Sequence, residues 1–377
     1  MANKRQIIEA ALSVLAQTRK ERPADRVMRD MFRVARGLDG GARRWISNRV
    51  FAYYRWKRWC QAANEKALHH AWDLQLAYQA STLRLSASDL RQGAIPDWLK
   101  GELKCPTPWL ASLQRLPRVW MRARLGEESK VMGTLSDTRA PVKGHPQCLE
   151  YTGEVDLYRT ALFRAGSYEL QDVASQAVGW LCAPRAKERW WDACAGAGGK
   201  MLLLADLMHH SGLIWASDRS ARRLTELKRR AGRAGVFNYR TCLWVKPEEI
   251  PVRTEFDGVL LDAPCSGIGT WQRNPHARWT TTPEDVRRLA EIQSELLARA
   301  ALRVRKGGRL IYSVCTLTDR ETTQVVRRFN ETKDGFEPVA LKSPFETNPG
   351  DAGKGTLCLW PHVTGGDGMF VAAWKRV

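Results

Sequence analysis

The sequence predicts an α/β fold, an open sheet of mostly parallel strands, which follows an all-helical amino-terminal region. The chain has 377 residues, 44% hydrophobic and 27% charged, a composition typical of a globular protein with two or three domains. From about Gly166 onward, apolar runs of strand length alternate with stretches of helical period, as in a sheet covered by helices. Residues 1–104 instead hold long amphipathic stretches with few Pro or Gly residues.

The elements follow in order along the chain. Apolar residues recur at helical spacing between Ile7 and Leu15, and Glu9 interrupts them, so the first element is an amphipathic helix rather than a signal peptide. A short strand-like run, Val119 to Arg124, marks a mixed region. We therefore predict three domains: a helical domain at 1–104, a small mixed α/β connecting subdomain at 105–165, and the main α/β domain at 166–377.

Within the main domain the periodicity changes repeatedly between two and 3.6 residues. Strands are predicted at 189–195, 212–218, 256–264, 308–315 and 368–376. Helices are predicted at 200–210, 220–232, 283–305 and 319–330. No apolar run approaches the roughly 18 residues that a membrane helix needs. We expect a cytoplasmic, monomeric protein with no membrane partner.

The charge of the chain is strongly positive and unevenly distributed. The net charge is +20, and residues 1–70 hold sixteen Lys or Arg against six Asp or Glu. Such an excess favours a polyanionic partner, since cations that meet phosphates release condensed counterions. In the stretch from Gly40 to Trp59, arginines alternate with aromatic residues. We interpret the aromatics as the core side of a helix in preference to base-stacking groups, and the basic face as a nucleic-acid contact.

A turn of small residues, "DACAGAGGK" from Asp192 to Lys200, lies between the first predicted strand of the main domain and its helix. Small residues allow close approach of a ligand, and a helix start offers free N–H groups. The turn is not a phosphate loop, because Met201 follows Gly199-Lys200 and Cys194 occupies the position of the first glycine. It also lacks the G-x-G-x-x-G dinucleotide fingerprint. NAD, ATP and S-adenosylmethionine remain possible on this motif alone.

An acid at the end of the next predicted strand narrows the choice of ligand. Asp218 in "WASDRS" lies about twenty residues beyond the turn, where a carboxylate can bind both ribose hydroxyls. The alternative is that Asp218 caps the following helix. With the glycine turn upstream we favour the ribose role.

Nine cysteines are scattered along the chain, without a C-x-x-C pair or a histidine cluster, so we expect neither a metal site nor a disulfide framework. Two of them differ from the rest. Cys265 in "LLDAPCSGIG" and Cys315 in "LIYSVCTL" each follow an apolar strand. Because the carboxyl ends of such strands line the ligand crevice, we expect both thiols and Asp262 to lie beside the cofactor turn.

Two thiols and an acid in one crevice suit a particular reaction. Carbon 5 of a pyrimidine is a poor nucleophile until a thiolate adds to carbon 6 and pushes electron density onto carbon 5. After methyl transfer a base must remove the proton from carbon 5 so that the thiolate can leave. An acid near the N3 edge of the ring stabilises the charge that develops there.

At this point the chain resembles a known family, the RNA 5-methylcytosine methyltransferases of the NOL1/NOP2/Sun group. The resemblance covers about residues 160–377 and rests on "DACAGAGGK", "SDRSARRLTELKRRAGRAG", "LLDAPCSGIGTWQRNPHARW" and "GGRLIYSVCTLTDRE". It implies a Rossmann-like, S-adenosylmethionine-dependent methyltransferase domain. The amino-terminal region is similar, more weakly, to the NusB-like, RNA-binding helical domain of the bacterial Sun/Fmu (RsmB-type) enzymes, which methylate small-subunit ribosomal RNA.

The resemblance also assigns roles to residues. Cys315 is expected to attack the cytosine, Cys265 to assist release, and Asp262 to contact the cytosine edge and the methyl donor. The implied residues for binding S-adenosylmethionine are Cys194, Ala195, Gly196, Ala197, Gly198, Gly199, Lys200, Asp218, Arg223 and Asp262. The sequence departs from the family pattern at Ala197, Val314 and Thr322, where proline, threonine and asparagine are common.

Three other interpretations stay open from sequence alone. The domain could be a non-catalytic scaffold for RNA binding and ribosome assembly, although both cysteines are intact. It could be a DNA cytosine methyltransferase, in which the Pro-Cys thiol attacks; the second cysteine motif favours RNA. The catalytic motifs also do not separate ribosomal RNA from transfer RNA. We expect ribosomal RNA as the substrate and partner.

Overall fold

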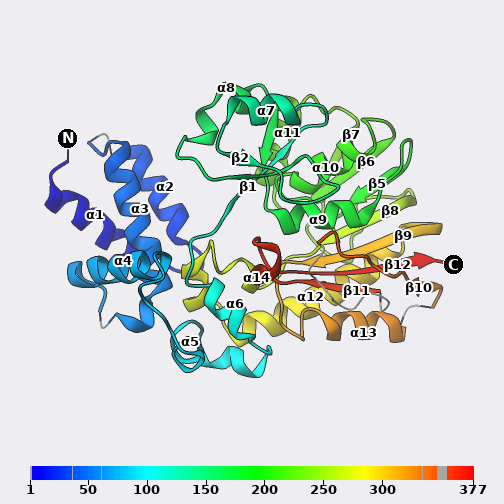
Figure 1. Ribbon diagram of the computed structural model, residues 1–377. Coiled ribbons are helices and arrows are strands. Elements are labelled where there is room, and N and C mark those ends of the chain that lie inside the picture. Colours follow the sequence, from blue (N-terminus) through cyan, green and yellow to red (C-terminus); the bar gives the residue numbers. More distant parts are fainter. Residues whose placement is uncertain (1, 36, 61, 333, 346–354) are drawn as a thin grey trace. The chain divides into compact units, whose positions relative to one another are not determined.

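The computed structural model describes residues 2–35, 37–60, 62–332, 334–345 and 355–377. The chain forms two compact units (Figure 1). The first, which we call the helical unit, comprises Met1–Pro117 and Gly267–Asp285. The second, the sheet unit, comprises Arg118–Ser266 and Val286–Val377. The chain thus leaves the sheet unit directly after Ser266 and returns to it nineteen residues later.

The helical unit confirms the prediction of helices over residues 1–104. Its helices are α1 (Lys4–Gln17), α2 (Ala24–Val34), α3 (Gly40–Arg55), α4 (Glu65–Gln79), α5 (Ala87–Gly93) and α6 (Thr107–Ser112). Side chains of Asn3, Asp39, Asn64 and Ser86 cap four of these helices by accepting a backbone N–H of the first turn. The interpretation of the aromatics as core is also confirmed, since Tyr53, Tyr54 and Trp56 are buried in the helical unit.

The segment Gly267–Asp285 is held in the helical unit by a buried arginine. The Arg278 guanidinium donates to the backbone carbonyls of Ala94, Leu113 and Trp271. Burial lowers the pKa of Arg278, and the nearby Arg55 lowers it further. Because backbone carbonyls rather than a carboxylate satisfy this cation, no charge pattern in the sequence announces the contact.

The sheet unit begins with a small antiparallel sheet. Its strands are β1 (Val119–Ala123), β2 (Thr138–Arg139), β3 (Cys148–Tyr151) and β4 (Tyr168–Leu170), in the order β2-β3-β1-β4. The predicted strand at Val119 is therefore confirmed. Arg122 of β1 and Arg124, directly after this strand, are buried and bind the carboxylate of Asp206 on α10 (Gly199–Leu207). These paired buried charges fix the small sheet to the main α/β layer.

The main sheet has the predicted α/β topology. Its strands are β5 (Arg189–Asp192), β6 (Leu213–Asp218), β7 (Tyr239–Leu243), β8 (Phe256–Asp262), β9 (Val304–Val314), β10 (Phe336–Pro338), β11 (Thr356–Leu359) and β12 (Met369–Arg376). Their order is β10-β12-β9-β8-β5-β6-β7, and β11 pairs with β12. Neighbours from β9 to β7 are parallel, whereas β12 is antiparallel to β9.

Helices cover both faces of this sheet, as Figure 1 shows. Helices α9 (Val173–Cys182), α10 and α11 (Ala221–Arg233) pack on one face, and α12 (Pro283–Ala301) and α13 (Thr323–Thr332) pack on the other. The sheet is therefore doubly wound, with a Rossmann-like fold. Because the strand order reverses between β5 and β8, their carboxyl ends open a crevice, the usual ligand site of such sheets.

Several sequence-based boundaries need correction. The short strands β7, β10 and β11 were not predicted. β7 and β10 lie at the sheet edges and lack a clear alternation of buried and exposed residues, whereas β11 alternates but is only four residues long. The helix predicted to reach residue 305 ends at Ala301, since the chain enters β9 at Val304. Among the described residues, none of the helices is both long and apolar enough to cross a bilayer.

Candidate functional site

The turn after β5 has a backbone that only glycine accommodates well. Gly196 and Gly198 have φ angles of +56° and +85°, in the left-handed region. A Cβ atom on Gly198 would also lie 2.7 Å from Cγ of Leu227. The turn is fixed to the end of β6, because Ala195 N–H donates to the Ser217 carbonyl over 2.8 Å. The small residues of "CAGAGGK" therefore allow the backbone to make a tight turn beside the crevice.

The start of α10 is open to a ligand. Its N-cap is Gly198, and in the described structure no side chain at this N-cap position accepts from the helix. Positive partial charge at this helix end favours a negatively charged group such as the carboxylate of an amino-acid moiety. This end lies directly after the turn from Cys194 to Gly198.

Asp218 ends β6 with only 5% of its surface exposed. Its Oδ2 accepts the Gly196 N–H over 3.0 Å and its Oδ1 accepts the Ser220 N–H over 2.8 Å. Helix α11 is capped by the Ser220 side chain, so the helix-cap role considered for Asp218 is filled by its neighbour. Arg223 Nη1 lies 3.8 Å from Asp218 Oδ2. The carboxylate is thus oriented by the glycine turn, with lone pairs left for ribose hydroxyls.

These features fit S-adenosylmethionine. The glycine turn allows close approach, the helix end favours the carboxylate of the methionine part, and the strand-end acid suits the ribose.

Replacing Asp218 with alanine is expected to weaken binding of S-adenosylmethionine about tenfold or more, since hydrogen bonds to a charged group contribute about 1.5–3 kcal/mol. Isothermal calorimetry checks this result, with the exposed Asp334→Ala variant as control. Unchanged affinity in a folded Asp218→Ala protein would remove Asp218 from the site.

Asp192, at the end of β5, is a site residue to which sequence reasoning assigned no role. It is fully buried, and neither carboxyl oxygen has a hydrogen-bond partner among the described residues. Burial raises the pKa of Asp192 to about 8, and the charges of Asp262 and Asp218 act in the same direction. Below that pH the group is a neutral acid. Its position at the start of the glycine turn is the sequence feature from which a role in the site could have been predicted.

The structure brings the two predicted cysteines together. Strands β8 and β9 are parallel neighbours, and Asp262 is in register with Ser313. The chain continues from these strand ends to Cys265 and Cys315, whose Sγ atoms lie 3.2 Å apart. Both side chains are partly accessible. Two thiols therefore share one edge of the sheet, next to the crevice between β5 and β8.

Asp262, at the end of β8, connects side chains from two other elements at this edge of the sheet. Its Oδ2 accepts the Lys200 ammonium over 2.7 Å, and its Oδ1 accepts the Ser313 hydroxyl over 2.7 Å. Burial opposes the charge on Lys200, but Asp262, the Cys315 thiol and Asp192 outweigh it and hold the pKa of Lys200 above its ordinary value. The lysine of the predicted cofactor turn is therefore a buried cation that binds Asp262 and interacts electrostatically with Cys315.

Six of the other seven thiols have raised pKa values. Burial raises the pKa of Cys60, Cys105 and Cys242 to about 11. Burial also raises the pKa of Cys148, Cys182 and Cys194 well above the ordinary range for a thiol. These six side chains stay protonated at neutral pH and act as small apolar groups.

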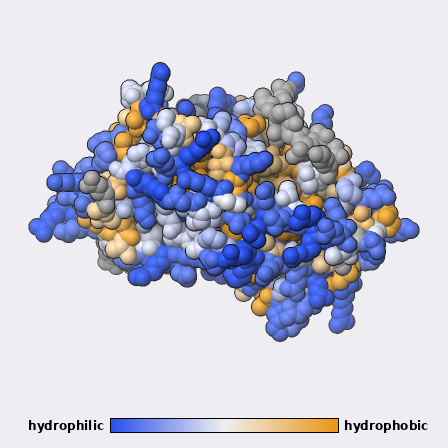
Figure 2. All heavy atoms as spheres, turned by 90° about the horizontal axis from the view of Figure 1, so that it is seen from below, coloured by the Kyte–Doolittle hydropathy of each residue, from blue (hydrophilic) through white to orange (hydrophobic). Residues whose placement is uncertain are grey.

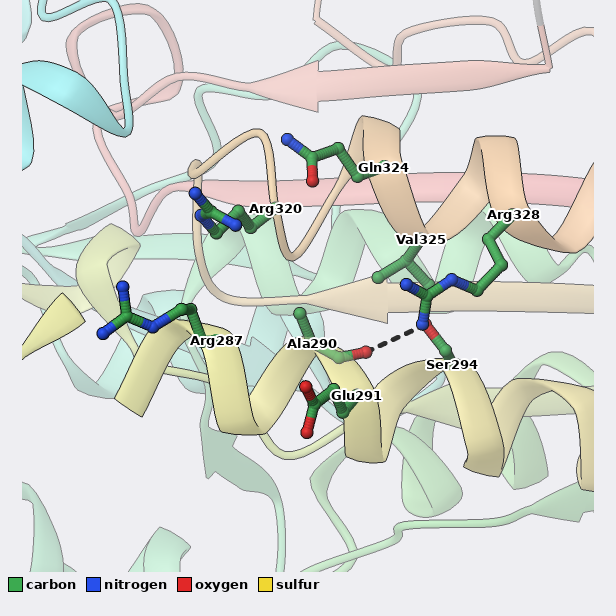
Figure 3. Close-up of a pocket in the computed structure, with 8 residues that line it drawn as sticks. All are labelled: Arg287, Ala290, Glu291, Ser294, Arg320, Gln324, Val325 and Arg328. Atoms are coloured by element: carbon green, nitrogen blue, oxygen red, sulfur yellow. Dashed lines mark hydrogen bonds between the residues drawn. The ribbon is translucent and has the colours of Figure 1, made fainter. Parts of the chain in front are cut away.

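A basic hollow lies between α12 and α13 (Figure 3). Its lining combines three arginines with one acid and neutral side chains: Arg287, Ala290, Glu291, Ser294, Arg320, Gln324, Val325 and Arg328. Figure 2 shows a face of the protein on which hydrophilic side chains predominate. The excess of arginine in the hollow favours an anionic ligand such as a phosphodiester.

A doubly wound sheet, a glycine turn with a strand-end acid, and a thiol pair at neighbouring strand ends together define the class of S-adenosylmethionine-dependent methyltransferase domains. The family model described as "16S rRNA methyltransferase RsmB/F" matches residues 179–375. The chain belongs to this family.

Individual relatives agree with the family. The chain is 33% identical over 304 residues to a "Probable ribosomal RNA small subunit methyltransferase B" of Synechocystis, covering 76% of this chain and 67% of the relative. It is 32% identical over 238 residues to the human "28S rRNA (cytosine(4447)-C(5))-methyltransferase", covering 60% and 29%. A solved methyltransferase homolog from Pyrococcus horikoshii aligns with a TM-score of 0.61 and 25% identity, covering 72% and 90%. The chain spans about half to two thirds of the length of the first bacterial relatives.

Proposed function

We propose that this protein is an S-adenosylmethionine-dependent RNA cytosine-C5 methyltransferase that acts on ribosomal RNA. The observation that carries the proposal is the pair of thiols, Cys265 and Cys315, 3.2 Å apart beside the Lys200–Asp262 ion pair. Methylation at carbon 5 needs one thiolate to activate the ring and a second group to release the product. The names of the relatives support ribosomal RNA over the transfer-RNA alternative.

We assign the first step to Cys315. Its thiolate adds to carbon 6 of the cytosine, and carbon 5 becomes nucleophilic. The buried Lys200 ammonium interacts electrostatically with Cys315. Bound S-adenosylmethionine supplies the methyl group. Cys265 then serves as the base that takes the proton from carbon 5, and the bond between Cys315 Sγ and carbon 6 breaks.

Asp262 is assigned to the pyrimidine edge. Both of its oxygens already accept a hydrogen bond, from Lys200 and Ser313, so the carboxylate is held in one orientation. A carboxylate fixed in this way can accept a hydrogen bond from the exocyclic amino group of cytosine and orient the ring for attack. Uracil lacks that donor, which makes Asp262 the group that selects cytosine.

RNA affinity is assigned to the basic surfaces. Residues 1–70 carry a net charge of +10, and the hollow between α12 and α13 adds three arginines. Both surfaces suit a phosphate backbone, whose contribution to affinity falls with salt. We place the protein in the cytoplasm, where ribosomal RNA of bacterial type is processed, and expect it to act as a monomer.

Bisulfite sequencing of total RNA from cells with and without the gene tests the proposal. We expect at least one cytosine in ribosomal RNA to lose its protection from deamination when the gene is absent, and to regain it when the gene is restored. Loss of protection in transfer RNA alone would make transfer RNA, rather than ribosomal RNA, the substrate. Unchanged protection in every RNA would contradict the enzymatic function.

A further inference from the structure

We infer that Glu321 is a positioning residue for both thiols, a single buried carboxylate that sets the distance between Cys265 and Cys315. The inference rests on the proposed function for its catalytic consequence. The geometric part does not depend on the substrate: Glu321 holds together the two thiol loops, the segments that follow β8 and β9 and carry Cys265 and Cys315.

Glu321 is fully buried and accepts hydrogen bonds from several elements at once. Its Oε1 accepts the Ser266 N–H over 2.8 Å and Gln293 Nε2 over 3.0 Å. Its Oε2 accepts the hydroxyls of Ser266, Thr316 and Thr318. A carboxylate has about four lone-pair sites, so these donors occupy it fully. Burying such a group is tolerable only because it is satisfied in this way.

The donors belong to both thiol loops. Ser266 directly follows Cys265, and Thr316 directly follows Cys315. Their hydroxyl oxygens lie 2.9 Å apart, so the two side chains meet at the same carboxylate oxygen. Glu321 therefore joins the residue after one thiol to the residue after the other. We therefore expect a change in its position to move both sulfur atoms.

A further set of contacts fixes Glu321 itself. Gln293 of α12 donates to Glu321 and also to the Pro264 carbonyl over 2.9 Å, directly before Cys265. The Tyr312 hydroxyl of β9 donates to the Glu321 carbonyl over 2.7 Å. The carboxylate is thus oriented by a helix on one side and a strand on the other. Such support limits the movement of reactive groups to the small range that catalysis tolerates.

Removing the carboxylate is expected to separate the loops without touching the ligand sites. A misplacement of about 1 Å can cost about 10²-fold in rate. We expect Glu321→Ala to lower kcat about 100-fold while KM for RNA and the affinity for S-adenosylmethionine change less than about threefold. Glu321→Gln keeps the volume and part of the hydrogen bonding, and we expect it to restore most of kcat. Glu331→Ala, which changes an exposed glutamate of α13, the helix that follows Glu321, is the matched control.

The distance between the thiols can be measured without RNA. Diamide oxidises two adjacent thiols to a disulfide and takes up the two hydrogen atoms itself. Peptide mapping then follows formation of the Cys265–Cys315 disulfide with time. We expect wild type, Glu321→Gln and Glu331→Ala to cross-link readily and Glu321→Ala to cross-link at least about tenfold more slowly.

The outcomes separate the inference from the proposed function. Slower cross-linking in Glu321→Ala supports the inference even if the wild-type protein methylates no RNA. Cross-linking of Glu321→Ala at the wild-type rate overturns it. If Glu321→Ala fails to fold, Thr316→Val removes one donor from the same carboxylate, and cross-linking as fast as in wild type then overturns the inference equally.

Discussion

Replacing Cys315 with alanine is expected to abolish methyl transfer, lowering kcat by about 10⁴-fold or more, as loss of a covalent nucleophile does in other enzymes. Without a thiolate at carbon 6, carbon 5 of the cytosine stays unreactive toward the methyl donor. Cys315→Ser is expected to be nearly as inactive, because a hydroxyl is a far weaker nucleophile at neutral pH. Transfer of a labelled methyl group from S-adenosylmethionine to RNA measures the effect.

The controls for this variant use the structure directly. Cys242→Ala removes a thiol of the same unit whose pKa is raised to about 11, and it should retain wild-type activity. Binding of S-adenosylmethionine by Cys315→Ala should also be unchanged, because the glycine turn and Asp218 are intact. Residual activity of Cys315→Ala above a few per cent of wild type would contradict its role as nucleophile.

The second large effect is expected for Lys200→Met, which keeps the length of the side chain and removes its charge. Asp262 would lose the ammonium that it binds over 2.7 Å, and Cys315 would lose its neighbouring cation. Breaking a buried pair by removing one partner leaves an uncompensated charge. We expect kcat to fall about 10²- to 10³-fold, the loss typical of one electrostatic contact in an active site.

Single-turnover methylation by Lys200→Met, compared with Lys246→Met, tests this expectation. Lys246 forms an exposed ion pair with Glu249 three residues away, and such surface pairs contribute little. Lys200→Arg retains the charge but not the geometry, so it should recover only part of the rate. Since the pKa of Lys200 is already above its ordinary value, raising the pH to 9 should not mimic the variant in wild type. Full activity of Lys200→Met would show that the Lys200–Asp262 ion pair is not needed for catalysis.

The parts of the fold and site that were predictable follow from local pattern. Strands β5, β6, β8, β9 and β12 are apolar runs bounded by turn residues, and parallel strands present their carboxyl ends at one edge of the sheet. That rule alone brings Asp218, Asp262, Cys265 and Cys315 into one crevice. The glycine turn was equally visible, because left-handed backbone at Gly196 and Gly198 demands glycine.

The parts that were missed depend on contacts between distant residues. Lys200 pairs with Asp262, sixty-two residues away, and this requires β5 and β8 to be neighbours in the sheet. Glu321 joins two loops through a serine fifty-five residues earlier. Arg278 is buried against carbonyls more than 160 residues distant. Sequence periodicity reports which side of an element is buried and not which element covers it.

The most direct test of the central claim, that the two thiols divide attack and release between them, is denaturing electrophoresis of Cys265→Ala after incubation with S-adenosylmethionine and the substrate RNA. The Cys265→Ala protein keeps the attacking thiol and loses the base for release, so we predict a covalent protein–RNA adduct that survives denaturation, with the nucleotide attached to the peptide that contains Cys315. Cys315→Ala and the double variant should form none. An adduct with Cys315→Ala, and none with Cys265→Ala, would contradict the assignment and make Cys265 the nucleophile.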